Sequence, residues 1–290
     1  MHWHGKSAQG RPRNVPSGSL ETRLLEPDAA IFRNEVFIVL HGLNLHPDRM
    51  LPWCELLRRS GRGVVRVVLA GHDPERPAAW GSVTAEQWLE DLSRAYADAR
   101  RRWPGAAICL FGYSLGAPLG LVWGIEHEVA WRRIVLLAPA LRVRGWLAPL
   151  LRLSSLVPRS RVRLPSLAPR RYRAHASTSL SAFHALQVLI ERFDAGAARF
   201  PRCPQLVIYT AQDELISTRV LQEYRERSPG TVTLHRLALS LARRYPCHLT
   251  IDPRTVGEAE WARLAGKVLE WLNREAPAPT VSHTWEALPG

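Results

Sequence analysis

Residues 108–117 read Ile-Cys-Leu-Phe-Gly-Tyr-Ser-Leu-Gly-Ala, an apolar run that ends in the pattern Gly-x-Ser-x-Gly. The run predicts a buried strand, and the apolar residues that follow predict a helix, so a sharp turn joins the two. Gly112 and Gly116 let the backbone crowd together there and push Ser114 to the apex in a strained conformation. Its hydroxyl then lies at a helix N-terminus, where N–H groups stabilise a developing oxyanion. The pentapeptide alone fits an incidental serine in a glycine-rich turn equally well.

The composition is that of a folded protein with a substantial core. The 290 residues are 46% hydrophobic, which suits one large domain or a domain that carries an insertion. The formal net charge of +13 comes almost wholly from arginine, because Lys6 and Lys267 are the only lysines. No common nucleic-acid-binding module is found, so we expect no nucleic-acid partner.

The cysteines and the first residues of the chain bear on its location. Residues 1–19 are polar and basic and lack the apolar segment of a secretory signal, and no segment reaches the ~20 apolar residues that span a bilayer. The four cysteines are widely spaced without a CxxC pair, and most lie in apolar contexts: Cys54, Cys109, Cys203 and Cys247. We therefore expect buried free thiols and a reducing, cytoplasmic location.

Predicted strands and helices alternate along the chain. Strands are predicted at 20–25, 35–40, 64–69, 106–111, 134–138, 206–209 and 231–237. Helices are predicted at 47–59, 85–102, 115–124 and 256–274. Thr84, with Gln87 three residues on, is a predicted N-cap. Short apolar strands separated by amphipathic helices predict an α/β protein with a doubly wound, mostly parallel sheet that is covered on both faces.

The alternation breaks after the fifth predicted strand. About 65 residues separate it from the next one, which is more than a connection in such a sheet needs. We therefore predict an inserted, mainly helical cap at 142–200, with Ser177 or Ser179 capping its last helix. The predicted core comprises 20–141 and 201–275, and the predicted flexible tails are 1–19 and 276–290.

The predicted cap is unusually basic. From Arg142 to Arg173 it holds nine arginines and no acidic residue, interleaved with leucines and Trp146. This pattern suits an acyl chain with an anionic head, or transient contact with an anionic lipid surface. The alternative explanation, which the composition slightly favours, is a solvated basic lid around a small apolar core.

Ser114 needs a base before it can act as a nucleophile. An imidazole removes the hydroxyl proton best when a carboxylate holds it in the right tautomer. Asp213 comes just after the predicted strand 206–209, at the end of the strand where catalytic groups gather in open sheets, and His248 follows the next strand. We predict that Asp213 orients His248 and that His248 activates Ser114.

These assignments have competitors. Glu214 lies beside Asp213, and His235 competes with His248, although it falls within a strand pattern and would have to project from the sheet. Four other histidines are expected to be solvated, to pack or to order loops: His41, His72, His175 and His184. An oxyanion also needs two N–H donors, which we predict to be the backbone amides of Leu43 and Leu115.

Together these segments resemble serine hydrolases of the α/β-hydrolase fold, of the carboxylesterase and monoacylglycerol-lipase type. The resemblance covers about residues 20–274 and is carried by His41-Gly42-Leu43-Asn44, Gly71-His72, Gly112-Tyr113-Ser114-Leu115-Gly116 and Cys247-His248-Leu249-Thr250-Ile251-Asp252. Their order, with Ser before Asp before His, is that of this fold. Ala117 stands where many relatives have a second glycine, and the arginine-rich cap resembles no lid of the family.

The resulting hypothesis is a serine hydrolase that cleaves an acyl ester or a monoacylglycerol-like substrate through an acyl-enzyme on Ser114, with no metal or organic cofactor. The alternatives are a thioesterase or acyltransferase on the same triad, and a non-catalytic protein that binds anionic lipid. A dinucleotide-binding fold is disfavoured because Gly-x-Gly-x-x-Gly is missing after the first strand. Dehalogenases and epoxide hydrolases of this fold carry a carboxylate where Ser114 stands.

Overall fold

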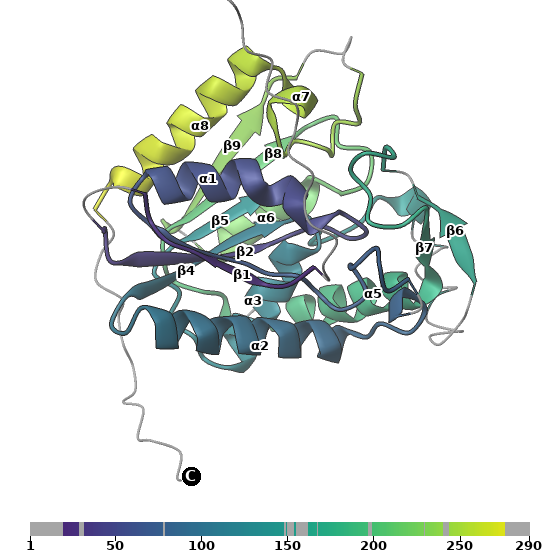
Figure 1. The fold of residues 1–290 in the computed structure, drawn as a ribbon. Coiled ribbons are helices and arrows are strands. Elements are labelled where there is room, and N and C mark those ends of the chain that lie inside the picture. Colours follow the sequence, from purple (N-terminus) through teal and green to yellow (C-terminus); the bar gives the residue numbers. More distant parts are fainter. Residues whose placement is uncertain are drawn as a thin grey trace, which may run out of the picture.

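The computed structural model describes ten stretches of the chain: 20–28, 32–77, 79–147, 149, 154, 162–166, 168–196, 199–228, 230–239 and 244–275. The predicted tails at 1–19 and 276–290 lie outside these residues. The described residues are built around a seven-stranded sheet in the order β1-β3-β2-β4-β5-β8-β9 (Figure 1). The doubly wound, mostly parallel sheet predicted from the sequence is thereby confirmed.

The strands follow the apolar runs. They are β1 (Arg23–Leu25), β2 (Glu35–Leu40), β3 (Gly63–Arg66), β4 (Ala107–Tyr113), β5 (Ile134–Leu137), β8 (Gln205–Thr210) and β9 (Val232–Leu237). Only β1 is antiparallel to its neighbour β3, and the other pairs are parallel. Strands β2, β3 and β5 are buried along their whole length because helices cover both faces of the sheet, and they are apolar except for the buried Glu35 and Arg66.

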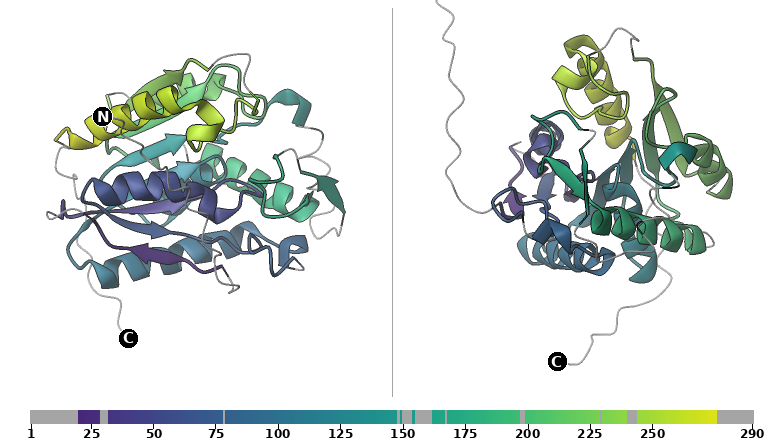
Figure 2. Two further views of the ribbon diagram at one scale, coloured as in Figure 1. Left: turned by 45° about the horizontal axis from the view of Figure 1, so that its top comes forward. Right: turned by 90° about the vertical axis from the view of Figure 1, so that its right-hand side faces the viewer.

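Helices cover both faces of this sheet. They are η1 (Pro47–Met50), α1 (Leu51–Arg59), η2 (Ala79–Gly81), α2 (Ala85–Arg102), α3 (Gly116–Glu126), η3 (Gly145–Leu147), α5 (Leu180–Ala195), α6 (Arg219–Arg227), α7 (Pro253–Val256) and α8 (Glu258–Asn273). Helices α1 and α8 lie on one face, and α2 and α3 lie on the other (Figures 1 and 2). Trp53 of α1 joins the first layer to the sheet, since its ring contacts Trp261 of α8 and Phe111 of β4.

The helix ends show why some predicted bounds hold and others move. Thr84 and Gln87 form the predicted capping box of α2. The predicted helix 256–274 is α8, which begins two residues later than predicted because Gly257, with φ 93°, separates it from the short helix α7. Helix α6 was not predicted: it is highly charged, and its only apolar signal is the short spacing of Val220, Leu221 and Tyr224, the residues that it buries.

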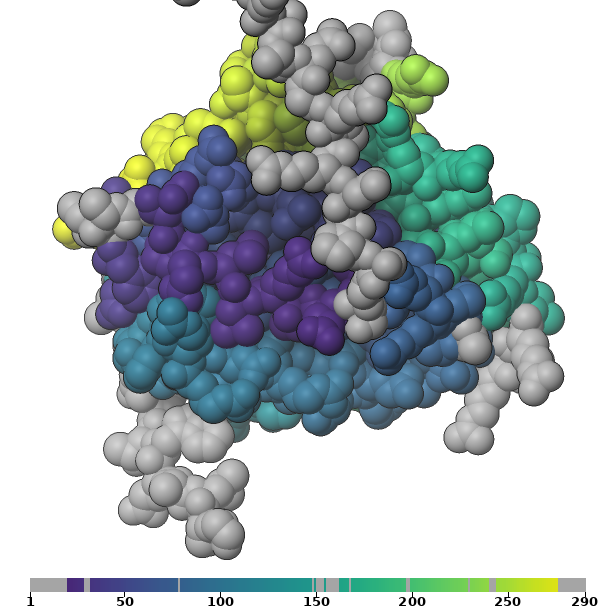
Figure 3. All heavy atoms as spheres, viewed as in Figure 1, coloured from purple at the N-terminus to yellow at the C-terminus, as the bar shows by residue number. Residues whose placement is uncertain are grey.

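The interval 142–200 lies at the end of the sheet where the parallel strands finish, to the right in Figures 1 and 3. Its described part contains η3, the antiparallel pair β6 (Arg163–Pro165) and β7 (Ser177–Ser179), and α5, which packs on α2 and α3. Ser179, not Ser177, caps α5 by accepting a hydrogen bond from the N–H of Ala182. Most of 148–161 lies outside the described residues, so the division into core and cap stays a prediction.

The cysteines of the core match the expectation of free thiols. None of the four forms a disulfide; Cys54 and Cys109 are buried, whereas Cys203 and Cys247 are partly exposed. Among the helices described, none is long and apolar enough to cross a membrane.

Candidate active site

Ser114 occupies the sharp turn between β4 and α3. Its φ is 50°, a strained value for a residue with a side chain, and its N–H donates to the carbonyl of Leu137 in β5 at 3.0 Å. The turn is possible because a Cβ atom on Gly112 would lie 2.7 Å from the carbonyl oxygen of Gly116, and one on Gly116 would lie 2.6 Å from that of Leu40. Only glycine fits either position without moving the backbone.

The structure brings Ser114, His248 and Asp213 together in one chain of hydrogen bonds. The distance from Ser114 Oγ to His248 Nε2 is 2.9 Å, and that from His248 Nδ1 to Asp213 Oδ2 is 2.8 Å. With the carboxylate accepting from Nδ1–H, Nε2 carries the lone pair and accepts the hydroxyl proton. This arrangement allows His248 to remove the proton from Ser114.

Asp213 is fully buried, in the turn after β8. Its second oxygen, Oδ1, accepts the backbone N–H groups of Leu215 at 2.9 Å and Ile216 at 3.0 Å. Burial by itself raises the pKa of Asp213, but attraction to His248 and the hydrogen bonds that the carboxylate accepts outweigh it, so the pKa lies below its ordinary value. Asp213 therefore remains a carboxylate at neutral pH.

Side chains from three elements hold the backbone on which His248 lies. Glu214 accepts the N–H of Cys247 at 2.7 Å and the N–H of His248 at 3.0 Å. Tyr113 Oη donates to the carbonyl of His248, and Thr210 Oγ1 donates to the carbonyl of Cys247. The sequence had suggested Glu214 only as a competitor of Asp213, and nothing in the spacing indicates this second use.

The two predicted oxyanion donors lie on either side of the serine. Leu115 is the N-cap residue of α3. Leu43 follows β2 in a loop so close to the turn that a Cβ atom on Gly42 would be 3.2 Å from Cβ of Ser114. Within the described part of the chain, neither N–H donates to a protein acceptor. Both are therefore free to donate to a bound substrate.

Asn44 ties the loop of Leu43 to the interval 142–200. The residue has φ 53°, and its side chain accepts the N–H of His175 at 2.8 Å and donates to Thr178 Oγ1 at 3.1 Å. Its own N–H donates to Nε2 of His72 at 3.1 Å. The segment 174–178 is consequently bonded to the loop that carries a candidate oxyanion donor.

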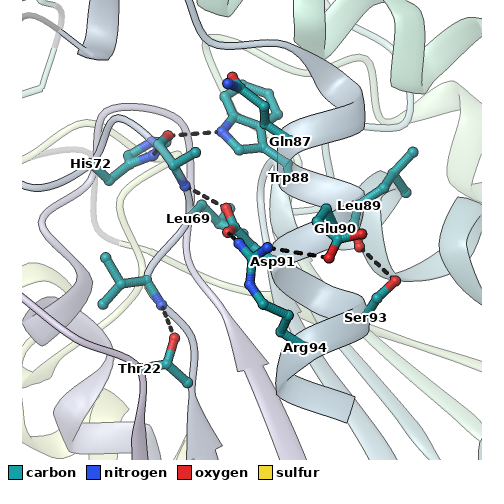
Figure 4. A network of polar contacts seen from close by, with 12 residues as sticks. Thr22, Leu69, His72, Gln87, Trp88, Leu89, Glu90, Asp91, Ser93 and Arg94 are labelled. Carbon is teal, nitrogen blue, oxygen red and sulfur yellow. Dashed lines mark hydrogen bonds and ion pairs between the residues drawn. The ribbon is translucent and has the colours of Figure 1, made fainter. Parts of the chain in front are cut away.

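Two buried histidines support this loop from below, as the sequence suggested. Nε2 of His41 accepts the N–H of Leu69 at 3.2 Å, and His72 packs edge-on against the His41 ring. The loop that carries His72 is anchored to α2, where Asp91 accepts the N–H of Ala70 and Trp88 donates to the carbonyl of Ala70 (Figure 4). This packing explains why neither histidine reaches the serine.

The remaining competitors lie elsewhere. His235 pairs in β9 opposite Ile208 of β8, and neither it nor His184 lines the cavity above Ser114. His175 is buried, and its Nε2 lies 2.6 Å from the carbonyl of Gly71. In the described ranges no three His, Cys, Asp or Glu side chains are grouped to hold a metal ion.

A cavity of about 390 Å³ opens over Ser114 and His248. Its walls are mostly apolar, and the interval 142–200 supplies many of them, including Val143, Trp146, Leu147, Phe183 and Leu186. None of the described lining residues is an arginine. The described arginines of the interval therefore do not line the space where a substrate's acyl group would lie.

Three arginines instead line a neighbouring hollow. This hollow, of about 630 Å³, is formed by Pro169, Arg170, Arg171, Arg244 and Tyr245. Pro169 also lines the cavity, so the hollow adjoins it. Among the described residues, no ion pair involves any of the three arginines, and we refer to this group as the arginine hollow.

The mostly parallel sheet, with a serine at a strand–turn–helix junction, defines the class as α/β hydrolases. A family model described as "serine aminopeptidase, S33" matches residues 33–238, and the chain belongs to this family. The α/β-hydrolase resemblance predicted from the sequence is thus confirmed.

Solved structures share the fold at low sequence identity. One reported among two metagenome-derived lipolytic enzymes, LipS and LipT, has a TM-score of 0.69 and 21% identity, over 86% of this chain and 96% of its own. A monoglyceride lipase from Saccharomyces cerevisiae has a TM-score of 0.67 and 11% identity, over 87% and 90%. A monoacylglycerol lipase from Paleococcus ferrophilus has a TM-score of 0.63 and 19% identity, over 87% and 100%. No curated protein matches the chain in sequence.

Proposed function

We propose that this protein is a serine hydrolase that cleaves carboxylic esters through an acyl-enzyme. The observation that carries the proposal is the continuous hydrogen-bonded chain from Ser114 through His248 to Asp213 at the floor of an apolar cavity. The lipases in the structural comparison add support at the level of the fold. Neither a metal ion nor an organic cofactor takes part in the proposed reaction.

The reaction proceeds in two acyl-transfer steps. Ser114 Oγ attacks the ester carbonyl as its proton passes to His248 Nε2, and the amides of Leu43 and Leu115 stabilise the resulting oxyanion. The tetrahedral intermediate collapses, and the alcohol leaves with the proton from His248. Water then attacks the acyl-enzyme, again with His248 as base, and releases the carboxylic acid while Ser114 regains its proton.

The cavity favours an acyl ester over a peptide. An aminopeptidase substrate presents a cationic amino group beside the scissile bond, which needs a carboxylate partner. The only acidic side chain among the described lining residues is Glu214, and both of its oxygens already accept backbone N–H groups. An apolar wall of this kind suits an acyl chain, with medium-chain esters or monoacylglycerols as the substrate class.

A serine-directed fluorophosphonate tests the proposal directly. We expect covalent labelling of the wild type and none of Ser114→Ala, together with hydrolysis of p-nitrophenyl esters by the wild type only. Amino-acid p-nitroanilides serve as the comparison and should be cleaved far more slowly. A wild type that resists labelling, or equal ester hydrolysis by Ser114→Ala, would sink the proposal.

The arginine hollow favours a second candidate, hydrolysis or transfer from an acyl thioester whose carrier bears phosphates. Three guanidinium groups beside the cavity would hold the phosphates while the acyl chain enters the apolar space. The variant with Arg170, Arg171 and Arg244 all changed to Ala should lose about tenfold in kcat/KM on octanoyl-CoA and nothing on p-nitrophenyl octanoate.

A variant with the same loss of charge controls for this test: Arg219, Arg225 and Arg227 of α6 changed to Ala. Equal losses of kcat/KM on octanoyl-CoA in both triple variants would show that the overall positive charge of the protein attracts the substrate, and not the arginine hollow in particular. Vesicle binding without any labelling of Ser114 would instead support the non-catalytic, anionic-lipid-binding alternative. The cytoplasmic location stays a prediction, which cell fractionation can test.

A further inference from the structure

Two adjacent carboxylates in the turn after β8 bind different parts of the same histidine. Asp213 accepts the imidazole Nδ1–H of His248 at 2.8 Å. Glu214 accepts backbone N–H groups with separate oxygens: Oε1 takes the N–H of Cys247 at 2.7 Å, and Oε2 takes the N–H of His248 at 3.0 Å. The imidazole ring and the backbone of His248 are thus both held by the adjacent residues Asp213 and Glu214.

The loop around His248 depends on contacts with side chains from other parts of the chain. Residues 244–250 lie in neither a helix nor a strand, so no regular hydrogen-bond ladder holds them. Thr210 and Tyr113 also donate hydrogen bonds to this backbone, and both of these bonds reach carbonyl oxygens. Glu214 alone among the described side chains takes the two N–H groups, and these fix the direction from which the imidazole approaches Ser114.

We propose that Glu214 is a positioning residue, which holds the backbone of His248 so that Nε2 stays within hydrogen-bonding distance of Ser114 Oγ. The inference rests on the proposed function, since its consequence is the rate of proton transfer from Ser114. A misplacement of about 1 Å at a reacting group costs about 100-fold in rate. Glu214 acts through His248 and need not touch the substrate's carbonyl.

The hydrogen-bonding capacity of a carboxylate distinguishes this positioning role of Glu214 from a role in packing alone. A carboxylate accepts two N–H groups with two oxygens, whereas the amide of glutamine has one oxygen and one NH₂ donor. Glu214→Gln therefore keeps the shape of the side chain, but its NH₂ group must face one of the two backbone N–H groups, and two donors cannot form a hydrogen bond. A side chain needed only for its volume would be replaced by Gln without loss.

The test compares Glu214→Gln and Glu214→Ala with a matched control, Glu223→Gln. Glu223 is a partly exposed carboxylate on α6 that is paired with Arg142 and, within the described residues, forms no hydrogen bond with the His248 loop. We expect both Glu214 variants to lower kcat on a p-nitrophenyl ester at least about tenfold with KM almost unchanged, and to slow fluorophosphonate labelling in parallel. The control should match the wild type in both assays.

A readout that does not depend on turnover completes the test. The low-field proton resonance of the His248 Nδ1–H reports whether the ring stays bonded to Asp213, and it should broaden or vanish in Glu214→Gln but persist in Glu223→Gln. An active wild type with Glu214→Gln unchanged in kcat and in this resonance overturns the inference alone. A wild type that neither labels nor hydrolyses overturns the proposed function, and the inference with it.

Discussion

The backbone N–H of Asn44 donates a hydrogen bond to Nε2 of His72, with 3.1 Å between the nitrogens. A ring nitrogen that accepts this bond carries no proton, so His72 is neutral, with its remaining proton on Nδ1, 3.3 Å from the carbonyl of Ala70. The same holds for His41, whose Nε2 accepts the N–H of Leu69. The loop that bears a candidate oxyanion donor thus rests on two histidines that must stay uncharged.

Stability should therefore fall in mild acid. Burial, the largest cause, lowers the pKa of His41 from 6.5 to about 3 and that of His72 well below 6.5. Below pH 6.5 the unfolded chain binds two protons that the native state does not, so the stability present above that pH is lost as the pH falls. The loss from the two histidines together is about 3 kcal/mol at pH 5.5, measurable by urea unfolding.

A variant isolates one of these protons. His41→Gln removes a single titrating group and should reduce the acid-dependent loss by about half of the two-histidine contribution, whatever its own stability at pH 8. A wild type equally stable at pH 7.5 and pH 5.5 would contradict this reading of both histidines.

Asn44→Ala should weaken the link between the Leu43 loop and the segment 174–178. The change deletes the side-chain hydrogen bonds to His175 and Thr178, each worth about 1 kcal/mol net. We expect a loss of about 2–4 kcal/mol in the free energy of unfolding, together with a lower kcat on esters. Thr178→Val, which removes one partner, should show a smaller loss, and the double variant should be less than additive.

Gly116→Ala should disrupt the turn that carries Ser114. The new Cβ atom would lie 2.6 Å from the carbonyl oxygen of Leu40, so the backbone of β2 or α3 must shift. A cost of about 1–3 kcal/mol or more and a large fall in activity are expected. Gly266→Ala in α8 is the control: its Cβ atom meets nothing within 4 Å, and it should raise stability by about 0.5–1 kcal/mol. Similar melting temperatures for the two variants would contradict the argument.

Asp213→Asn should lower kcat by about 10⁴-fold while Ser114 and His248 remain in place. An asparagine can present its NH₂ to Nδ1 and favour the tautomer that carries the proton on Nε2, which then cannot accept from Ser114. Steady-state kinetics on a p-nitrophenyl ester measure the loss. Glu214 lies next in the chain but has its oxygens on Cys247 and His248, so it should not substitute, and a loss of less than tenfold would show that it does.

Much of the fold could be predicted because it depends on local patterns. The strand 35–40 and the helix 85–102 were predicted with their observed bounds, since the strand is apolar after Glu35 and the helix has a capping box and an amphipathic face. Helix α6 was missed because its sequence is mostly charged, and its three buried apolar residues are too few to give a clear helical periodicity. The predicted helix 256–274 corresponds to α8, and its start was predicted two residues too early because the positive φ of Gly257 separates α8 from the short helix α7.

The candidate site divides in a similar way. Ser114, Asp213 and His248 could be named from motif, strand ends and order along the chain, because parallel strands bring their carboxyl ends to one edge. The roles of Glu214 and of Asn44 depend on contacts across 34 and 131 residues, which no local spacing encodes. The basic composition of 142–173 also suggested arginines over the substrate, whereas the described cavity wall is apolar and the arginine hollow lies beside it.

By itself, the sequence determined the class of fold and the turn at Ser114, because strand burial, helix periodicity and the glycines at 112 and 116 act over a few residues. Only the tertiary structure decided which side chains hold Ser114 and His248 in position. The direction of the hydrogen bonds shows that His41 and His72 are uncharged. It also shows that Glu214 accepts the backbone N–H groups of Cys247 and His248. Such choices depend on distances between segments far apart in the chain, which are fixed only when the core packs.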